Sequence, residues 1–361
     1  MKLKIIPIFI PHLGCFDHCI YCDQKGITGI NAEISTDVVQ ERIETYFSQI
    51  LTSCPGISSA NIQIAFFGGN FTGLDPAVQE SLLEISKSYV EKKLVDSVRI
   101  STRPDFLNQD ILSFLKERYV RTIEIGVQSL DDEVLSQSGR NYHSEDVLRS
   151  FKRLRENRFQ VGIQLMLGLP EDTPEKIKET VRTTINLKPD FVRLYPTLVI
   201  QGTALEKLYQ EGKYRPMRLD EILRLCKAIL LNLEMHQIPV IRLGLHPSES
   251  LMDRIVDGPF HPALKHLVKS EISYDLISLA FKKHPKPDYN RAVFYVPRGS
   301  LSEFKGYQKE NIRKTETEFK VRHVDFVEQE EIMQGTLIAL LDDEETEVHK
   351  KDLMALKSYH L

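Results

Sequence analysis

Short apolar runs alternate with segments of helical periodicity along the first two-thirds of the chain. The runs are rich in β-branched and aromatic residues, and several are continuously apolar, as strands buried on both faces are. They predict six strands, at Lys4–Ile10, Ile62–Phe67, Ser97–Ser101, Thr122–Val127, Val161–Leu167 and Phe191–Tyr195. The segments between them predict five helices, at Asp37–Leu51, Pro76–Lys92, Gln109–Lys116, Ser144–Asn157 and Pro174–Asn186. Right-handed crossovers between such units predict an α/β fold with a parallel sheet, here a partial (β/α)6 TIM-like barrel.

The remaining third has a different pattern. It predicts a helix at Leu219–His236, a strand at Pro239–Leu245, a helix around Ala263–His284, and then a strand–helix–loop–helix–strand module over 292–326. The acidic run Asp342–Glu347 predicts a solvated turn or tail. We therefore expect a barrel at 1–245, a helical connector at 246–290 and a small basic α/β module at 291–361.

Composition narrows the class of protein. The 361 residues are 42% hydrophobic and 27% charged, which is typical of a globular protein with a large core and excludes a disordered, collagen-like or coiled-coil chain. No apolar run reaches the roughly 18 residues of a membrane span, so we expect no membrane partner. The segment Met1–Pro11 predicts a first strand rather than a signal peptide, which favours a cytoplasmic protein.

Three of the five cysteines, Cys15, Cys19 and Cys22, form a C-x3-C-x2-C cluster directly after the first predicted strand. Three thiolates on one short loop can hold three irons of a four-iron cluster and leave the fourth iron for an outside ligand. The alternative is structural zinc, which needs a fourth ligand, here His12 or His18. The two other cysteines are too few for the thiolates that a second cluster normally takes.

The cluster, with Tyr21 between its last two cysteines, resembles the signature of the radical S-adenosylmethionine (SAM) enzymes. The resemblance implies a [4Fe-4S] cluster on Cys15, Cys19 and Cys22 whose fourth iron binds SAM, with Tyr21 near the adenine. It further implies an electron donor such as flavodoxin or ferredoxin, and reductive cleavage of SAM to methionine and a 5′-deoxyadenosyl radical. It identifies no catalytic acid or base, and it leaves the enzyme class, oxidoreductase or transferase, open.

Motifs at the ends of later strands extend the resemblance over roughly residues 5–215. They resemble the radical domain of the elongator catalytic-subunit branch, which modifies wobble uridine in transfer RNA, and more distantly the oxygen-independent coproporphyrinogen dehydrogenases. The motifs are Gly68-Gly69-Asn70-Phe71-Thr72, Thr102-Arg103-Pro104-Asp105, Gly126-Val127-Gln128-Ser129 and Tyr195-Pro196-Thr197-Leu198-Val199-Ile200. The cofactor-binding candidates are Tyr21, Gly68, Gly69, Asn70, Arg103, Glu124, Gln128 and Arg140.

Several of these candidates also have a purely structural interpretation. The paired glycines could form an ordinary turn, and Arg103 could form a surface ion pair with Asp105 or a neighbour. Glu124 could stand at an exposed strand start, and Arg140 could cap the next helix. Two differences from the elongator branch limit which of its properties we expect in this chain. The cysteine spacing here is more compact, and the chain leaves no room for an acetyltransferase domain, so we do not expect acetyl-dependent chemistry.

The last predicted module is locally basic. Residues 291–322 hold eight Lys or Arg and four Asp or Glu, an excess of +4 in a chain of net charge −4. The loop Gly306–Asn311 loosely resembles the KH-type loop that clamps an RNA backbone, although Lys309 stands in place of its second glycine. The candidates for RNA contact are Tyr195, Lys305, Lys309 and Arg313. The alternative is a plain capping subdomain.

These features give three hypotheses. The first is a radical SAM enzyme that modifies an RNA base, with transfer RNA as partner. The second keeps the radical chemistry but acts on a small molecule or peptide. The third is a non-catalytic, zinc-bound RNA-binding or scaffold protein.

Overall fold

The computed structural model describes residues 3–15, 19–29 and 35–361. Its described residues form two compact units. The first comprises Met1–Met217 with Leu245–Pro259, and the second Arg218–Gly244 with Phe260–Leu361. This division differs from the expected ranges, because the chain leaves the first unit at Arg218 and returns to it for 245–259.

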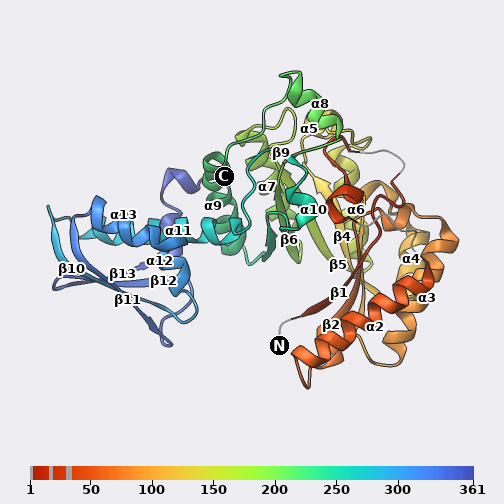
Figure 1. Cartoon of the computed structure of the whole chain (residues 1–361), viewed down its shortest axis with the longest axis horizontal. Coiled ribbons are helices and arrows are strands. Elements are labelled where there is room, and N and C mark those ends of the chain that lie inside the picture. The colour runs from red at the N-terminus through yellow and green to blue at the C-terminus, as the bar shows by residue number, and fades with distance from the viewer. Residues whose placement is uncertain (1–2, 16–18, 30–34) are drawn as a thin grey trace. The chain divides into compact units, whose positions relative to one another are not determined.

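Parallel strands lie side by side at the centre of the first unit (Figure 1). Neighbours along the chain are also neighbours in the sheet, in the order β1-β2-β3-β4-β5-β6, which confirms the predicted partial (β/α)6 sheet. The strands are β1 (Lys4–Phe9), β2 (Ile62–Phe67), β3 (Ser97–Thr102), β4 (Val120–Gln128), β5 (Gln160–Leu167) and β6 (Phe191–Pro196).

Helices follow each of the first five strands. The longer ones are α2 (Thr36–Ser53), α3 (Pro76–Glu91), α4 (Gln109–Glu117), α6 (Ser144–Glu156) and α7 (Pro174–Leu187). Their starts are set by local chemistry: Asn108 accepts a hydrogen bond from the Ile111 amide at α4, and Thr173 caps α7 with Pro174 in the first turn. Short elements that the sequence did not predict are α1 (Gln24–Thr28), α5 (Asp132–Gln137), α8 (Ala204–Gln210), α10 (Glu249–Met252) and the strand pair β7 (Val199–Ile200) and β9 (Ile255–Asp257).

The two faces of the sheet differ in chemistry because side chains alternate along each strand. On one face, Phe66, Ile100, Ile123 and Val161 are direct neighbours on successive strands, and none of them is exposed. The other face carries Arg99, Glu124 and Arg193 together with several glutamines. One face is therefore an ordinary apolar core, and the other is polar.

A buried ion network spans the polar face. Glu124 Oε1 lies 2.8 Å from Nη1 of Arg99, and Glu124 Oε2 lies 2.7 Å from Nε of Arg193. Gln63 Oε1 accepts from Nε and Nη2 of Arg99 at 3.1 and 2.9 Å. Glu124 is buried in this network, so the alternative of an exposed strand start is wrong. The network satisfies a carboxylate that would otherwise be costly to bury.

The second unit contains a four-stranded sheet in the order β11-β10-β12-β13, in which only β10 and β11 are parallel. Its elements are α9 (Leu219–Met235), β8 (Val240–Leu243), α11 (Leu264–Lys283), β10 (Tyr289–Pro297), α12 (Leu301–Lys305), α13 (Glu310–Glu318), β11 (Val321–Gln329), β12 (Thr336–Leu341), β13 (Glu344–His349) and α14 (Lys350–Leu353). The predicted strand–helix–loop–helix–strand module is confirmed as β10, α12, α13 and β11. None of the described helices could span a membrane.

The acidic run near the end was predicted wrongly. Glu344 begins strand β13, which pairs with β12 in an antiparallel hairpin. Buried Thr346 and Val348 alternate with exposed glutamates along it. Only two residues of this strand face the buried side, and the exposed glutamates between them hide the alternation of buried and exposed positions.

We predict that Glu124→Ala strongly destabilises the first unit, because it leaves two buried guanidinium groups without their carboxylate. The expected loss is roughly 3–5 kcal/mol in the free energy of unfolding, measured by urea denaturation with circular dichroism. Glu179→Ala is the control, since Glu179 and Arg182 form an exposed ion pair on α7 worth at most about 1 kcal/mol. Equal losses in the two variants would contradict the prediction.

Candidate active site around the three-cysteine loop

The three clustered cysteines lie on the loop that leaves β1, and all three are free and half-buried. Burial, together with the nearby thiols of Cys19 and Cys15, raises the pKa of Cys22 to about 12. Burial and Cys19 also raise the pKa of Cys15, while Arg140 and Arg103 lower it. The thiols therefore lie close enough to affect one another electrostatically, beside two cations. His18 lies outside the described residues.

The paired glycines after β2 support this loop from behind. The His12 amide donates to the Gly68 carbonyl at 3.0 Å, and the Asn70 amide donates to the Leu13 carbonyl at 2.9 Å. A Cβ on Gly69 would lie 2.5 Å from the Ile10 carbonyl oxygen, which is too close for any side chain. Gly68 has a φ of +86°, a conformation that glycine adopts without strain. Close backbone approach thus explains the motif locally.

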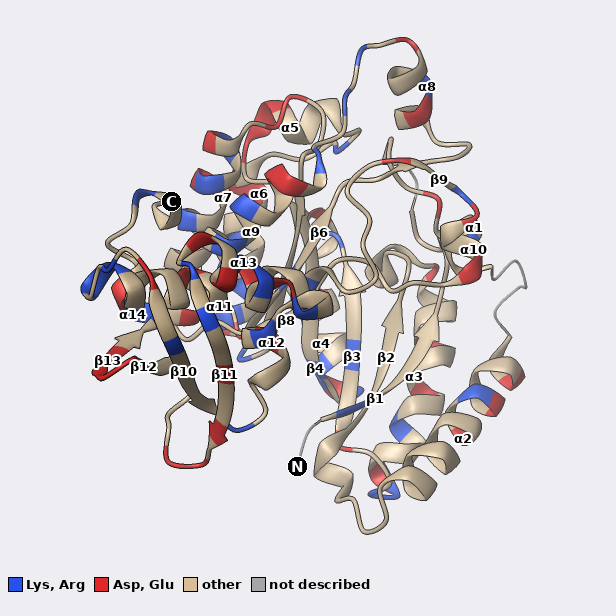
Figure 2. Ribbon diagram, turned by 60° about the vertical axis from the view of Figure 1, so that its left-hand side comes forward, with Lys and Arg blue, Asp and Glu red and all other residues tan. Residues whose placement is uncertain are grey.

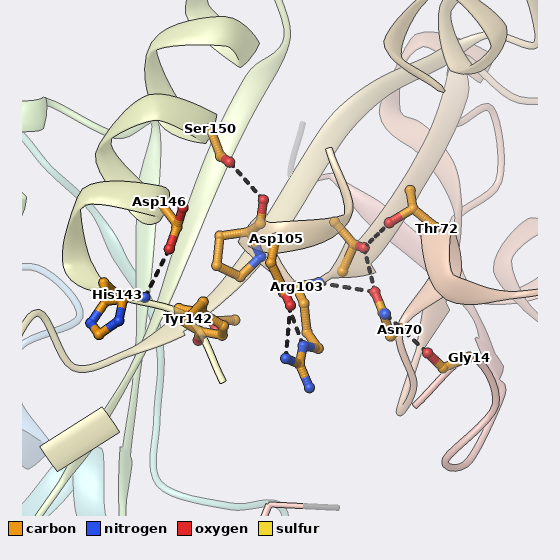
Figure 3. Close-up of polar contacts among 12 residues, drawn as sticks. Gly14, Asn70, Thr72, Arg103, Asp105, Tyr142, His143, Asp146 and Ser150 are labelled. Atoms are coloured by element: carbon orange, nitrogen blue, oxygen red, sulfur yellow. Dashed lines mark hydrogen bonds and ion pairs between the residues drawn. The ribbon is translucent and has the colours of Figure 1, made fainter. Parts of the chain in front are cut away.

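Asn70 joins the cysteine loop to the end of β3 (Figure 3). Its Nδ2 donates to the Gly14 carbonyl at 3.0 Å. Its Oδ1 accepts from the Thr102 hydroxyl at 2.7 Å and from the Arg103 amide at 3.1 Å. The side chain is almost fully buried. Asn70 therefore fixes the start of the loop relative to two strands.

Arg103 forms the ion pair with Asp105 that its structural interpretation anticipated. Nε and Nη2 donate to the two carboxylate oxygens at 3.0 and 2.8 Å (Figure 3). The pair is largely buried rather than superficial, and the Arg103 guanidinium lies 5.5 Å from the ring centre of Tyr142. Bidentate pairing holds the Arg103 side chain in one orientation.

Arg140 is a second buried cation beside the same tyrosine. Its guanidinium lies 5.6 Å from the ring centre of Tyr142, and its Nη2 donates to the Tyr21 hydroxyl at 3.0 Å. Among the described residues nothing accepts from its buried Nε–H. Arg140 does not cap the following helix, which begins with His143 and Asp146 instead.

Tyr21 is a core residue as well as a neighbour of the cysteines. It is 8% exposed and packs with Val134, Leu169, Val199 and Leu205, and Cys19 and Cys22 lie against the same cluster. Its hydroxyl is held by Arg140. The side chain thus seats the last two cysteines on the apolar core.

Gln128 reaches this region through a β-bulge at the end of β4. The register shifts between Gly126 and Gln128, and Gln128 adopts a φ of +67°. A Cβ on Gly126 would lie 3.0 Å from Nε2 of Gln128 and 3.7 Å from Nη2 of Arg140. The bulge therefore brings the Gln128 amide onto the face that Arg140 occupies, whereas Glu124, two residues before Gly126, belongs to the ion network of the sheet.

Sequence reasoning overlooked three contributors: Tyr142, Arg99 and Arg193. Tyr142 orders both guanidinium groups and donates to the Gly126 carbonyl at 2.9 Å. Arg99 and Arg193 hold Glu124. The sequence contained a signal for the two arginines, because each interrupts an apolar strand at an inward-facing position.

The residues present fit an iron–sulfur cluster. Thiolates bring negative charge into a half-buried loop when they bind metal, and the buried cation Arg140, with a free Nε–H, stands beside them. A zinc site completed by His12 fits less well, because its Nε2 accepts from the Gln24 amide at 2.5 Å. The described residues contain no group of three or more His, Cys, Asp or Glu that could hold a single metal ion.

The RNA-contact candidates divide between the units. Tyr195 is half-buried on β6, and its hydroxyl accepts from Arg193 Nη1 at 3.3 Å. Lys305, Lys309 and Arg313 belong to the second unit, where Lys309 and Arg313 are exposed. Arg313 Nη1 donates to the Gln308 carbonyl at 2.9 Å, which braces the loop.

A parallel α/β sheet with a three-cysteine loop after its first strand defines a class of cofactor-dependent enzymes, and comparison with protein families specifies it. A model described as the Radical SAM superfamily matches residues 9–184, and one described as the Radical_SAM C-terminal domain matches residues 189–274. The chain belongs to the radical SAM superfamily. It is a radical SAM enzyme, and members of this superfamily use a [4Fe-4S] cluster and SAM.

Two of the individual relatives have different names. The chain is 25% identical over 242 residues to the heme chaperone HemW of Bacillus subtilis, covering 65% of this chain and 61% of the relative. It is 29% identical over 156 residues to a tRNA uridine(34) acetyltransferase of Methanocaldococcus jannaschii, covering 42% and 28%. The matches thus span less than two thirds of these relatives' lengths.

A solved structure supports the fold. Archaeal Methanocaldococcus infernus Elp3 with an N-terminal deletion superposes with a TM-score of 0.58 at 20% sequence identity, covering 80% of this chain and 69% of that chain. This similarity concerns the fold alone.

We predict that Asn70→Ala lowers cluster occupancy, because the cysteine loop loses its side-chain link to β3. Iron and sulfide per chain after anaerobic reconstitution, and the cluster's visible absorbance, are the measurements. Asn70→Asp retains the acceptor oxygen but loses the donor to Gly14, so we expect an intermediate loss. Full occupancy in Asn70→Ala would refute this role.

We also predict that Cys19→Ala abolishes cluster assembly and SAM cleavage while the sheet stays folded. Iron content, 5′-deoxyadenosine release after reduction, and circular dichroism are the readouts. Cys54→Ala is the matched control, because Cys54 follows α2 outside the loop, and we expect it to retain the cluster. Normal cleavage by Cys19→Ala would exclude the assignment.

Proposed function

We propose that this radical SAM enzyme modifies an RNA base, with transfer RNA as the substrate. In this proposal Cys15, Cys19 and Cys22 bind three irons of the cluster. When bound, the cluster and SAM supply a 5′-deoxyadenosyl radical that abstracts hydrogen from the substrate. The enzyme acts in the cytoplasm and takes its electron from a donor such as flavodoxin or ferredoxin.

The cofactor-facing residues have distinct parts in the proposal. Gln128 at the end of β4 and Arg140 in the loop after α5 lie on one face, and the Arg140 Nε–H, for which no described residue is an acceptor, can bind SAM. Arg103, held by Asp105, adds a second cation for a carboxylate. Tyr21 seats the loop on the core, and Gly68, Gly69 and Asn70 hold it from the other side.

The unpaired basic groups of the second unit carry the RNA part of the proposal. Arg291, Arg298 and Lys314 are neutralised by carboxylates. Among the described residues, in contrast, no carboxylate lies within ion-pair distance of Lys305, Lys309 or Arg313. Figure 2 shows that basic and acidic residues are interspersed on α12 and α13, so the free charges gather around the loop between them rather than over the whole module.

The geometry of that loop suits a backbone-binding role. Gly306, Gln308 and Lys309 all have positive φ, which turns the chain sharply between α12 and α13. Asn311 is buried and donates from Nδ2 to the Ser270 carbonyl at 2.9 Å, which anchors the turn. A fixed, exposed basic turn can contact phosphates without reading sequence. The similarity to tRNA uridine(34) acetyltransferases favours RNA as the source of those phosphates.

A second candidate function follows from the similarity to the heme chaperone. That match covers more of this chain than the acetyltransferase match does. A tetrapyrrole is therefore the specific small molecule to test against RNA. Hemin titration followed by absorbance, alongside transfer-RNA gel shifts, separates the two: binding of hemin without binding of RNA at low salt would favour the second candidate.

We predict that Lys309→Glu weakens transfer-RNA binding by about tenfold or more at low salt, because it replaces one phosphate contact with repulsion. SAM cleavage without substrate is measured in parallel to confirm that the site is intact. Lys351→Glu, the same charge change on exposed α14 of the same unit, is the control. Equal weakening by the two variants would show that only net charge matters and would remove this loop from the proposal.

A further inference from the structure

The polar face of the sheet in the first unit carries more positive than negative charge. Arg99 and Arg193 both pair with Glu124, and no other carboxylate among the described residues lies within ion-pair distance of either guanidinium. The network therefore holds two cations and one anion. A surplus charge away from water is costly unless an anion compensates it.

The surplus positive charge of the Arg99–Glu124–Arg193 network is accessible to solvent at one end, at Arg193. The side chains of Arg99 and Glu124 are only 5% and 4% exposed, but that of Arg193 is 20% exposed. Arg99 is fully engaged, since Phe191 covers its guanidinium at 4.9 Å and Gly162 leaves the space that this ring needs. Among the described residues of this network, Arg193 is therefore the cation that an external anion can reach.

The groups around Arg193 suit a flat, anionic ligand. The guanidinium lies 5.0 Å from the ring centre of Phe67, and Nη1 donates to the half-buried Tyr195 hydroxyl over a long 3.3 Å. Glu124 holds Nε and Nη2 of Arg193 at 2.7 and 3.0 Å, which leaves Nη1 and the Tyr195 O–H as the two neighbouring donors for one incoming oxygen. Half-buried Phe67, and Phe9 with its ring centre 6.3 Å away, provide apolar surface beside them.

We propose that Arg193 and Tyr195 form an anion subsite for the substrate, which takes one oxyanion of a molecule with a flat ring. The assignment of the anion to the substrate rests on the proposed function, whereas the anion subsite itself does not. The shared chemistry is a phosphate or a carboxylate: a phosphodiester if the substrate is RNA, or a propionate if it is a tetrapyrrole. The subsite belongs to the first unit and is independent of the basic loop of the second.

The first experiment probes the subsite without a substrate. Inorganic phosphate should raise the thermal midpoint of the wild type and of Arg193→Lys more than that of Arg193→Gln, with potassium chloride at equal ionic strength as reference. Arg182→Gln, on exposed α7, should behave as wild type. An equal phosphate effect in Arg193→Gln and wild type, or no effect in wild type, would overturn the proposal.

The second experiment identifies the source of the anion. Dissociation constants for bulk transfer RNA and for hemin are compared among wild type, Arg193→Gln, Arg193→Lys and Tyr195→Phe. We expect Arg193→Gln to weaken the true ligand about tenfold, the loss of one charge-assisted hydrogen bond, with partial rescue by lysine and a smaller effect of Tyr195→Phe. If RNA is the ligand, the slope of log Kd against log salt concentration should also decrease by about one in Arg193→Gln, the equivalent of one lost phosphate contact.

The outcomes separate this subsite from the proposed function. If wild type binds transfer RNA and Arg193→Gln binds it equally well with the same salt dependence, the subsite is wrong while the RNA proposal stands. If wild type binds hemin and not RNA, and Arg193→Gln weakens it, the subsite is supported and the RNA proposal fails. If wild type binds neither, the RNA proposal fails and the phosphate titration decides the subsite.

Discussion

Glu124 holds together a sheet that must be apolar on one face and charged on the other. The helices bury the apolar face in the usual way, but two arginines on the opposite face stay charged when removed from water. The Glu124 carboxylate lies between Arg99 and Arg193 and compensates their charge. Gln63 accepts a further hydrogen bond from the Arg99 guanidinium. The same face is consequently the one available for polar chemistry.

The cysteine loop depends on contacts that contain no cysteine. Gly69 lets the turn after β2 come within backbone distance of the loop, and Asn70 then ties Gly14 to the end of β3. Arg140 and Tyr21 hold the loop from the other side. Because these supports come from different strands, the cysteines are positioned by the assembled sheet rather than by their own short segment.

The two kinds of basic group in the chain have different surroundings. Arg140 and Arg193 are largely buried and held by aromatic or acidic partners in the first unit. Lys309 is exposed on a sharply turned loop in the second. Buried guanidinium groups orient a bound anion, whereas exposed ammonium groups attract a polyanion and are screened by salt. In our proposal, the buried groups position a bound anion and the exposed loop attracts a polyanion.

Local features of the sequence were enough to predict the alternating fold, the clustering of three cysteines on one loop and the excess of basic residues in the last module. Strand periodicity, cysteine spacing and charge count can all be read without knowing which distant residues meet. The sequence reading missed hairpin β12–β13, because the exposed acidic residues of β13 hide the alternation of that strand. It also left open whether Arg103 and Glu124 are exposed to solvent or buried. Only the tertiary structure decided that both are buried, and that Arg193 joins Glu124, because register between distant strands sets which side chains meet.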